Sequence, residues 1–221
     1  MRSIAIDGPA GAGKSTIARK TAAELGFIYV DTGALYRTVA LAVKQAGVLP
    51  DEEAQVAQVL KDTKVELKFV NDEQRVFLND VDVSDEIRSP EISMMASQVS
   101  AIGKVREFLF SLQQNIAKQN DVIMDGRDIG TVVLPHADVK IFLTATAEDR
   151  AKRRYDQLLQ SGTVVDFEQL LEEIKQRDYN DMHREIAPLR QAEDAILVDT
   201  TGNTLEESIQ LLRQLILKNL Q

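Results

Sequence analysis

Apolar residues in this chain fall into short continuous runs separated by longer stretches with helical spacing. Short continuous runs are typical of strands that are covered on both faces, as in parallel sheets. They occupy residues 3–7, 27–30, 122–125, 139–143 and 195–198. Helical spacing predicts helices at residues 14–25, 33–45, 51–62, 103–119, 147–159, 166–185 and 204–220. This alternation predicts an α/β fold: a five-stranded parallel sheet with helices on both faces.

The pattern changes between residues 63 and 90. Residues 64–70 and 75–78 are short β-like runs around Asn71, Asp72 and Glu73, which favours an antiparallel hairpin. Residues 81–88 close this region, and Pro90 begins another helical stretch. We therefore expect a core of residues 1–62 and 91–221, with a small inserted unit at residues 63–90.

Composition narrows the possible chemistry. The chain has 221 residues, of which 44% are hydrophobic, enough for one α/β domain with an insertion. It has no cysteine and two histidines, which excludes disulfides and thiolate sites and argues against a histidine-built zinc site. A formal net charge of -9 argues against a general nucleic-acid or membrane surface. Without a spanning apolar run or a signal peptide ahead of the first strand, we expect a cytoplasmic protein.

A glycine-rich segment, GPAGAGKST, joins the first strand to the first helix. The spacing of Gly8, Gly13, Lys14 and Ser15 is the P-loop signature in its required strand–turn–helix context. Its backbone N–H groups can surround a polyphosphate, while Lys14 reaches the outer phosphates and Ser15 ligates Mg²⁺. We therefore expect ATP at Gly8, Pro9, Ala10, Gly11, Ala12, Gly13, Lys14, Ser15 and Thr16.

Two further segments follow predicted strands, where open α/β sheets bind ligands. They are DTGALYR at residues 31–37 and DGRDIG at residues 125–130. Arg37 and Arg127 could each grip a phosphate with two N–H groups. The alternative for each arginine alone is an ordinary surface ion pair. Asp125 could orient a Mg²⁺-bound water or support the P-loop.

The predicted helix from Asp166, with Gln169 placed for a variant capping box, has a face that changes character. The face begins with four apolar residues: Phe167, Leu170, Leu171 and Ile174. The same spacing then gives Arg177, Asp181 and Arg184, which suggests that this end faces a polar cleft. The alternative is a helix end that emerges into water.

The helix at residues 147–159 carries Arg150, Arg153 and Arg154 within about one turn. Such a cluster is repulsive unless an anion joins it, and a triphosphate would supply one. The alternative is a solvated face paired with Glu148, Asp149 and Asp156. The break at Ser161 and Gly162 is typical of a mobile lid, here residues 147–165.

Five motifs, in this order, resemble bacterial cytidylate kinases: IDGPAGAGKST, DTGALYR, ASQVSAIGKVRE, DGRDIGTVV and EIKQRD…R…APL. The P-loop is shared by many NTPases, whereas DGRDIGTVV with ASQV…VRE is much more specific. The resemblance covers nearly the whole chain. It implies a P-loop nucleoside-monophosphate-kinase fold with a monophosphate-binding insertion and a short helical lid. It implies phosphoryl transfer from ATP to CMP or dCMP, with Mg²⁺, giving ADP and CDP or dCDP.

The resemblance also implies roles for individual residues. The residues that match CMP-binding positions are Thr32, Tyr36, Arg37, Ser97, Arg106, Arg127, Asp128, Arg177, Asp181 and Arg184. Within this set, Ser97, Arg106 and Asp128 read the cytosine, Asp181 contacts the ribose, and the other arginines grip the phosphate. From the arginine cluster itself, we expect a catalytic set of Lys14, Arg127, Arg150 and Arg154, with Arg153 in the ATP site; which of the lid arginines touches the γ-phosphate stays open. The chain departs from the family at Thr32, often a serine, and at Ala10, a serine in some members.

Two rival functions remain open. A kinase for another small acceptor, such as a different nucleotide or shikimate, would share the P-loop and the arginines but lack the cytosine-reading set. A P-loop switch protein would normally carry an Asn-Lys-x-Asp segment, which this sequence lacks. We expect a monomer whose partners are the small molecules ATP and CMP or dCMP.

Overall fold

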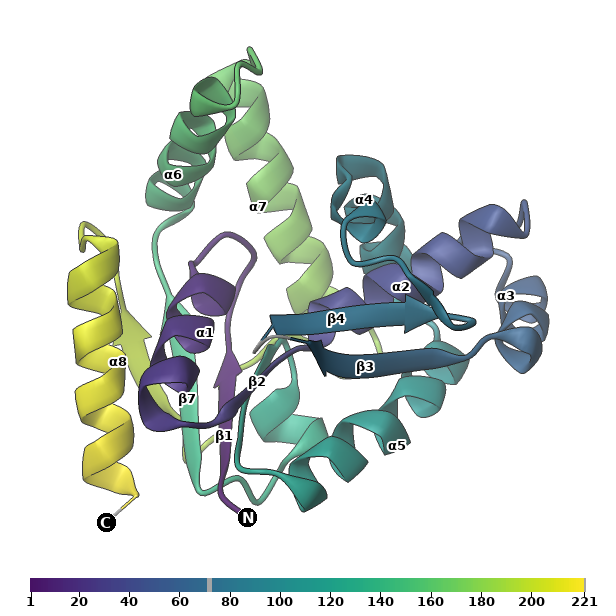
Figure 1. Ribbon diagram of the computed structural model, residues 1–221. Coiled ribbons are helices and arrows are strands. Elements are labelled where there is room, and N and C mark those ends of the chain that lie inside the picture. The colour runs from purple at the N-terminus through teal and green to yellow at the C-terminus, as the bar shows by residue number, and fades with distance from the viewer. Residues whose placement is uncertain (71–72, 221) are drawn as a thin grey trace. The chain divides into compact units, whose positions relative to one another are not determined.

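The computed structural model describes residues 1–70 and 73–220 (Figure 1). The chain forms two compact units. The first comprises Met1–Tyr29 and Asn120–Gln221, and the second comprises Val30–Gln119. No helix among the described residues is long and apolar enough to cross a bilayer.

A five-stranded parallel sheet organises the first unit. Its strands are β1 (Ser3–Asp7), β2 (Ile28–Asp31), β6 (Val122–Gly126), β7 (Val139–Thr144) and β8 (Ile196–Asp199). Their spatial order is β2-β6-β1-β7-β8, so β1 lies between two strands from the second half of the chain. Ile4 pairs with Ile123 on one side and with Val139 on the other. Ile4, Ala5 and Ile6 are fully buried, which explains their continuous apolar run.

Helices pack on this sheet where their apolar faces meet the strands. Helices α1 (Lys14–Leu25) and α8 (Leu205–Asn219) lie side by side and share a hydrophobic cluster with β1, β6 and β7 (Figure 1). A capping box at Thr204 and Glu207 starts α8. Helices α6 (Ala147–Gln160) and α7 (Phe167–His183) pack against each other as a hairpin.

The second unit combines helices with a three-stranded antiparallel sheet, β3-β4-β5. Its strands are β3 (Val65–Val70), β4 (Glu73–Leu78) and β5 (Val81–Asp82). Its helices are α2 (Thr32–Gln45), α3 (Glu53–Val59), α4 (Pro90–Val99) and α5 (Gly103–Gln119), with 3₁₀ turns at Leu60–Asp62 and Glu86–Arg88.

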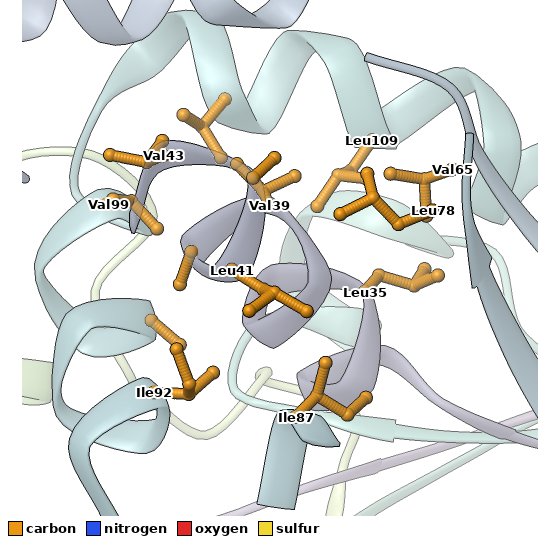
Figure 2. Packing of buried hydrophobic residues seen from close by; sticks show 14 of the residues in the cluster. Leu35, Val39, Leu41, Val43, Val65, Leu78, Ile87, Ile92, Val99 and Leu109 are labelled. Carbon is orange, nitrogen blue, oxygen red and sulfur yellow. The ribbon is translucent and has the colours of Figure 1, made fainter. Parts of the chain in front are cut away.

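Helix α2 forms the centre of this second unit. Leu35, Val39 and Val43 are completely buried, and Leu41 is nearly so (Figure 2). A helix whose apolar residues extend beyond one narrow stripe has to be covered by several neighbours. Helices α4 and α5 and the sheet strands β3 and β4 provide that cover.

The α/β class, the five-stranded parallel sheet and the separate antiparallel strands are confirmed. The helix expected at residues 51–62 is shorter: α3 begins at Glu53 and gives way to a 3₁₀ turn at Leu60. The helix expected to reach residue 185 ends at His183, because Arg184 has an extended backbone. The expected hairpin turn at Asn71 and Asp72 lies outside the described residues.

We predict that Gly8→Ala destabilises the protein by about 2 kcal/mol or more, because overpacking displaces neighbouring backbone. Gly8 has φ +148°, and an added Cβ would lie 1.9 Å from the Leu143 carbonyl oxygen. Urea unfolding measures this loss. The control is Gly26→Ala. Gly26 has φ +71°, and apart from its chain neighbours no described atom lies within 4 Å of an added Cβ, so only a backbone strain of about 1 kcal/mol is expected. Equal losses in the two variants would contradict the steric explanation.

Candidate active site

The loop from Gly8 to Gly13 joins the carboxyl end of β1 to α1. Gly11 and Gly13 have φ values of +75° and +82°, a left-handed backbone that favours glycine. No side chain caps the start of α1 at Gly13, and the first turn carries no acidic residue. The N–H groups and the positive end of this described helix are therefore suited to a polyanion.

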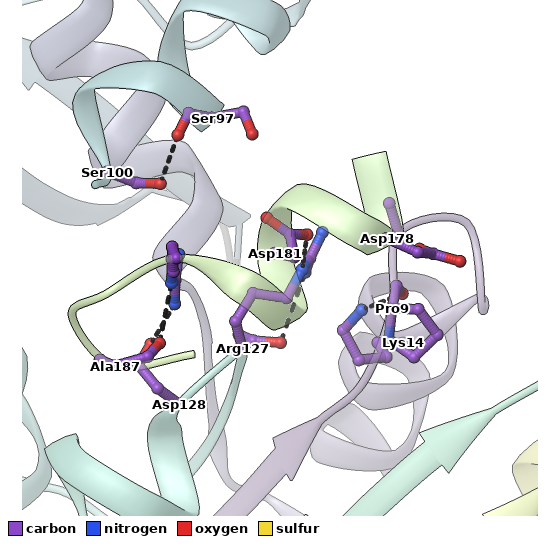
Figure 3. A network of polar contacts seen from close by, with 12 residues as sticks. Pro9, Lys14, Ser97, Ser100, Arg127, Asp128, Asp178, Asp181 and Ala187 are labelled. Atoms are coloured by element: carbon purple, nitrogen blue, oxygen red, sulfur yellow. Dashed lines mark hydrogen bonds and ion pairs between the residues drawn. The ribbon is translucent and has the colours of Figure 1, made fainter. Parts of the chain in front are cut away.

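The side chain of Lys14 crosses this loop. It is 6% exposed, and its Nζ donates a hydrogen bond to the Pro9 carbonyl oxygen at 2.7 Å (Figure 3). Burial, together with the positive charge of Arg127, lowers the pKa of Lys14 to about 7. Because the unfolded chain binds this proton more tightly, Lys14 disfavours folding most at and below pH 7, and this cost decreases as the pH rises toward 10.5.

Asp125, at the end of β6, supports the first turn of α1. Its Oδ2 accepts a hydrogen bond from Ser15 Oγ at 2.7 Å, and its Oδ1 accepts one from Tyr29 Oη at 3.1 Å. Among the described residues, no three acidic or histidine side chains form a metal cage. A hydroxyl beside one carboxylate nevertheless fits Mg²⁺, which takes few protein ligands and keeps water and phosphate oxygens.

Arg127 follows β6 and contacts the carboxyl end of α7. Its Nε donates to Asp181 Oδ2 at 2.8 Å, and Asp181 is 5% exposed (Figure 3). Burial raises the pKa of Asp181, but the charge and hydrogen bond of Arg127 outweigh burial and hold it below its usual value. Burial likewise lowers the pKa of Arg127, and Asp181 reverses that shift. The charged end of α7 is therefore buried in an ion pair and does not emerge into water.

The next residue, Asp128, lies close to Arg184. Arg184 Nη2 is 3.6 Å from Asp128 Oδ1, and both side chains are less than 10% exposed. Arg184 Nε also donates to the Ala187 carbonyl oxygen at 2.8 Å (Figure 3). Arg177 is half-buried on the same face of α7. The structure therefore brings Arg127, Asp128, Asp181 and Arg184 together within the first unit.

Carboxylates of the protein compensate two of the three arginines on α6. Arg150 is 4% exposed and forms an ion pair with Asp178 of α7, while its Nη1 donates to the Ala10 carbonyl oxygen at 2.9 Å. Arg153 pairs with Asp149 and donates to the Thr200 carbonyl oxygen at 2.6 Å. Arg154 is exposed. The sequence analysis missed Asp178, although it lies one helical turn beyond Ile174 on the face already identified.

In the second unit, Asp31 fixes the position of Arg37. Asp31 Oδ1 caps α2 by accepting from Ala34 N at 2.9 Å, and Oδ2 accepts from Arg37 Nη2 at 3.0 Å. The Asp31 N–H donates to Gln74 Oε1 at 2.9 Å. Thr32, the first residue of α2, is buried.

A second group in this unit joins α2, α4 and α5. Arg106 is 9% exposed, its Nη1 donates to the Ser100 carbonyl oxygen at 3.2 Å, and its guanidinium lies 5.6 Å from the centre of the Tyr36 ring. Ser100 Oγ donates in turn to the Ser97 carbonyl oxygen at 2.8 Å (Figure 3). Tyr36, Ser97 and Arg106, distant in sequence, are thus connected.

Asp7, at the end of β1, is a buried carboxylate that the sequence analysis did not single out. Its Oδ1 accepts from Ile129 N and its Oδ2 from Gly130 N, both at 2.7 Å. Burial raises the pKa of Asp7 to about 6, against the effect of these two hydrogen bonds. The available signal was one acidic residue at the end of an otherwise apolar strand.

We predict that Lys14 titrates near pH 7 in the free protein, and that Mg²⁺-ATP moves the midpoint upward by about one pH unit or more, because the phosphates favour the ammonium form. NMR of the lysine Cε groups, with Lys14→Arg for assignment, measures this. The exposed Lys104, whose pKa is raised by Glu107, is the internal control. A midpoint near 10.5 for Lys14 in the free protein would contradict this prediction.

Comparisons with known proteins agree over nearly the full length. The family model described as Cytidylate kinase matches residues 4–218. The chain is 56% identical to the cytidylate kinase of Caldicellulosiruptor bescii over 215 residues, covering 97% of this chain and 95% of that protein. It is 49% identical to the cytidylate kinase of Bacillus subtilis, with 93% and 92% covered. An uncharacterized protein from Eubacterium ventriosum has a similar fold, with TM-score 0.54, 12% identity and 98% of each chain covered. This chain belongs to the cytidylate kinase family.

Proposed function

We propose that this protein transfers the γ-phosphoryl group of Mg²⁺-ATP to CMP or dCMP, giving ADP and CDP or dCDP in nucleotide metabolism. Membership of the cytidylate kinase family, through a match that includes residues 4–218, carries this proposal. It acts as a monomer in the cytoplasm on small molecules, without nucleic-acid or membrane partners.

The donor is ATP, and Gly8 to Thr16 bind its phosphates. The left-handed glycines and the uncapped start of α1 support this assignment, since both direct backbone N–H groups toward one anion. Ser15 ligates Mg²⁺, with Asp125 acting on it directly or through a water. The bond from Ser15 to Asp125 supports this choice, because it orients the hydroxyl oxygen.

The acceptor is a cytidine monophosphate. Its phosphate is held by Arg37, Arg127, Arg177 and Arg184. The geometry of Arg127 supports this role. Asp181 and the Gly126 carbonyl accept from its Nε and Nη1, and because a guanidinium carries five N–H donors, it can bind a phosphate oxygen as well. Asp181 contacts the ribose hydroxyls, and Thr32 and Tyr36 complete the acceptor-binding set.

Ser97, Arg106 and Asp128 select cytosine. The base offers a 4-amino donor beside the N3 and O2 acceptors, which suit a carboxylate or hydroxyl and a guanidinium respectively. Uracil places an oxygen where cytosine has its amino group, so the Asp128 carboxylate would meet another acceptor. Buried polar groups left unpaired in this way give strong discrimination.

Catalysis consists of alignment and charge screening. The phosphate of CMP is already an anionic nucleophile, so the reaction needs no strong general base. Lys14, Arg127, Arg150 and Arg154 stabilise the transferring phosphoryl group, and Arg153 contributes to ATP binding. Arg150 supports this role through its bond to the P-loop carbonyl of Ala10.

A coupled assay that measures ADP release with different acceptors tests the function. We expect CMP and dCMP to be the best acceptors, with UMP, AMP, GMP and shikimate poor, because only cytosine matches the base-reading set. Without an acceptor, ATP hydrolysis should be slow. Water is the nucleophile that competes with CMP, and an active site that excludes water suppresses that reaction. Preference for another acceptor, or fast hydrolysis by the protein alone, would contradict the proposal.

Asp128→Ala tests the base-selecting role. We expect the ratio of kcat/KM for CMP to that for UMP to fall by about a hundredfold, because the loss removes a buried base-specific acceptor. The KM for ATP should change little. Arg37→Ala is the matched comparison, since it should weaken both monophosphates equally. If Asp128→Ala lowers CMP and UMP turnover by the same factor, Asp128 does not read the base.

A further inference from the structure

A turn at Ile129–Val133 follows Asp128 and is held from another strand. The first two N–H groups of this turn donate to the two carboxylate oxygens of Asp7, each at 2.7 Å. Asp7 ends β1, which pairs with β6 immediately before this loop, with Asp7 opposite Gly126. Asp7 is 5% exposed, so no bulk water competes for these bonds.

Asp128 occupies the residue position that normally caps such a turn. An aspartate there usually accepts the N–H of the second or third residue of the turn, here Gly130 or Thr131, with its own side chain. Within this described turn, Asp128 makes no such capping bond. Its carboxylate instead points toward Arg184, whose Nη2 lies 3.6 Å away.

We propose that Asp7 is a positioning residue for base selection: it caps the turn in place of Asp128 and so directs the Asp128 carboxylate toward the nucleobase. This inference rests on the proposed function, in which Asp128 reads cytosine. An aspartate at this position has two competing uses, and a second carboxylate from β1 removes one of them.

The geometry leaves little freedom for another arrangement. A Cβ added at Gly130 would lie 3.4 Å from Asp7 Oδ2 and 3.2 Å from the Lys140 side chain, so the turn packs closely against both residues. Each Asp7 oxygen serves one N–H, and an amide in its place has only one acceptor oxygen. In Asp7→Asn, the side-chain NH₂ group would therefore lie against one of the two backbone N–H groups of the turn, donor against donor. The turn must then move, or that N–H must take the Asp128 side chain as its acceptor.

The quantity measured has to separate base selection from any change in ATP binding. Asp7 also lies near Lys14, whose charge acts on it, so a variant could alter the donor side. The ratio of kcat/KM for CMP to that for UMP cancels such changes, because both reactions use the same ATP and the same Lys14. We therefore test Asp7→Asn, Asp128→Ala and the double variant by this ratio.

The matched control is Asp138→Asn. Asp138 Oδ2 accepts from Ser3 N at 2.7 Å, so this variant also weakens a bond from a carboxylate to a backbone N–H, but at the opposite end of β1. Its CMP-to-UMP ratio should equal that of the wild type. Urea unfolding of all variants shows whether each one is folded under the assay conditions.

We expect Asp7→Asn to lower the CMP-to-UMP ratio at least about tenfold. Losses of this size are typical when a hydrogen bond that orients a ligand-binding side chain is removed, as at metal sites. In the Asp128→Ala background, Asp7→Asn should leave the ratio unchanged, because Asp7 acts through Asp128. If Asp128→Ala lowers the ratio and a folded Asp7→Asn does not, the positioning role is wrong while the proposed function stands. If Asp128→Ala leaves the ratio unchanged, Asp128 does not read the base and the positioning role of Asp7 is wrong as well, whereas the preference for CMP as acceptor is decided by the acceptor panel.

The wild-type protein provides a measurement that does not depend on the variant folding. Burial raises the pKa of Asp7 to about 6 against its two backbone hydrogen bonds, while the charge of Asp128 adds to the rise and that of Lys14 opposes it. Lys140 packs against the same turn at Gly130. Protonation below this pH removes one acceptor oxygen, so the CMP-to-UMP ratio should fall between about pH 7.5 and about pH 5. The phosphates of CMP and UMP titrate alike, so their effect cancels. A constant ratio over this range would overturn the proposal.

Discussion

The carboxyl end of β1 has to satisfy two requirements in consecutive residues. The Asp7 carboxylate holds the turn that follows β6, and Gly8 lies so close to the Leu143 carbonyl of β7 that it has no room for a side chain. The glycine-rich loop that precedes α1 begins at the same point. Because β1 is the central strand, its end fixes the loops after β1 and β6 relative to one another within the first unit. The candidate active site of this unit depends on that junction.

Buried charges in the first unit are arranged in pairs. Arg127 pairs with Asp181 and Arg150 with Asp178, and every member except the partly buried Arg127 is less than 15% exposed. Breaking one member of a buried pair typically costs about 3–5 kcal/mol, because it leaves the other charge uncompensated. The protein can therefore keep several arginines close together before any phosphate arrives. The Asp181 carboxylate offsets the charge of Arg127 through its Nε alone, and a guanidinium carries five N–H donors.

The sequence predicts most of the architecture because each strand of the parallel sheet is a local apolar run, as in residues 122–125 and 139–143. It also predicts the glycine-rich loop between β1 and α1, because the glycines and Lys14 lie in one short segment. The charged continuation of the α7 face was visible as well, since Arg177 and Asp181 follow from helical spacing. Other features are not local. Asp7 and Gly130 are joined by a hydrogen bond across 123 positions, and the turn at Ile129–Val133 is too short to show periodicity. The partner of Arg150 was missed because an ion pair between two helices leaves no repeat in the sequence.

The placement of β1 also determines the order in which the chain can fold. This strand precedes both of its neighbours by more than a hundred residues, since they begin only at Val122 and Val139. At a synthesis rate of about 5–20 residues per second, the apolar side chains of Ile4 and Ile6 wait roughly ten seconds for their partners. Residues 30–119 form one uninterrupted unit with its own hydrophobic cluster. All residues of that unit precede β6 in the chain, so its hydrophobic cluster can form while β1 still lacks both neighbouring strands.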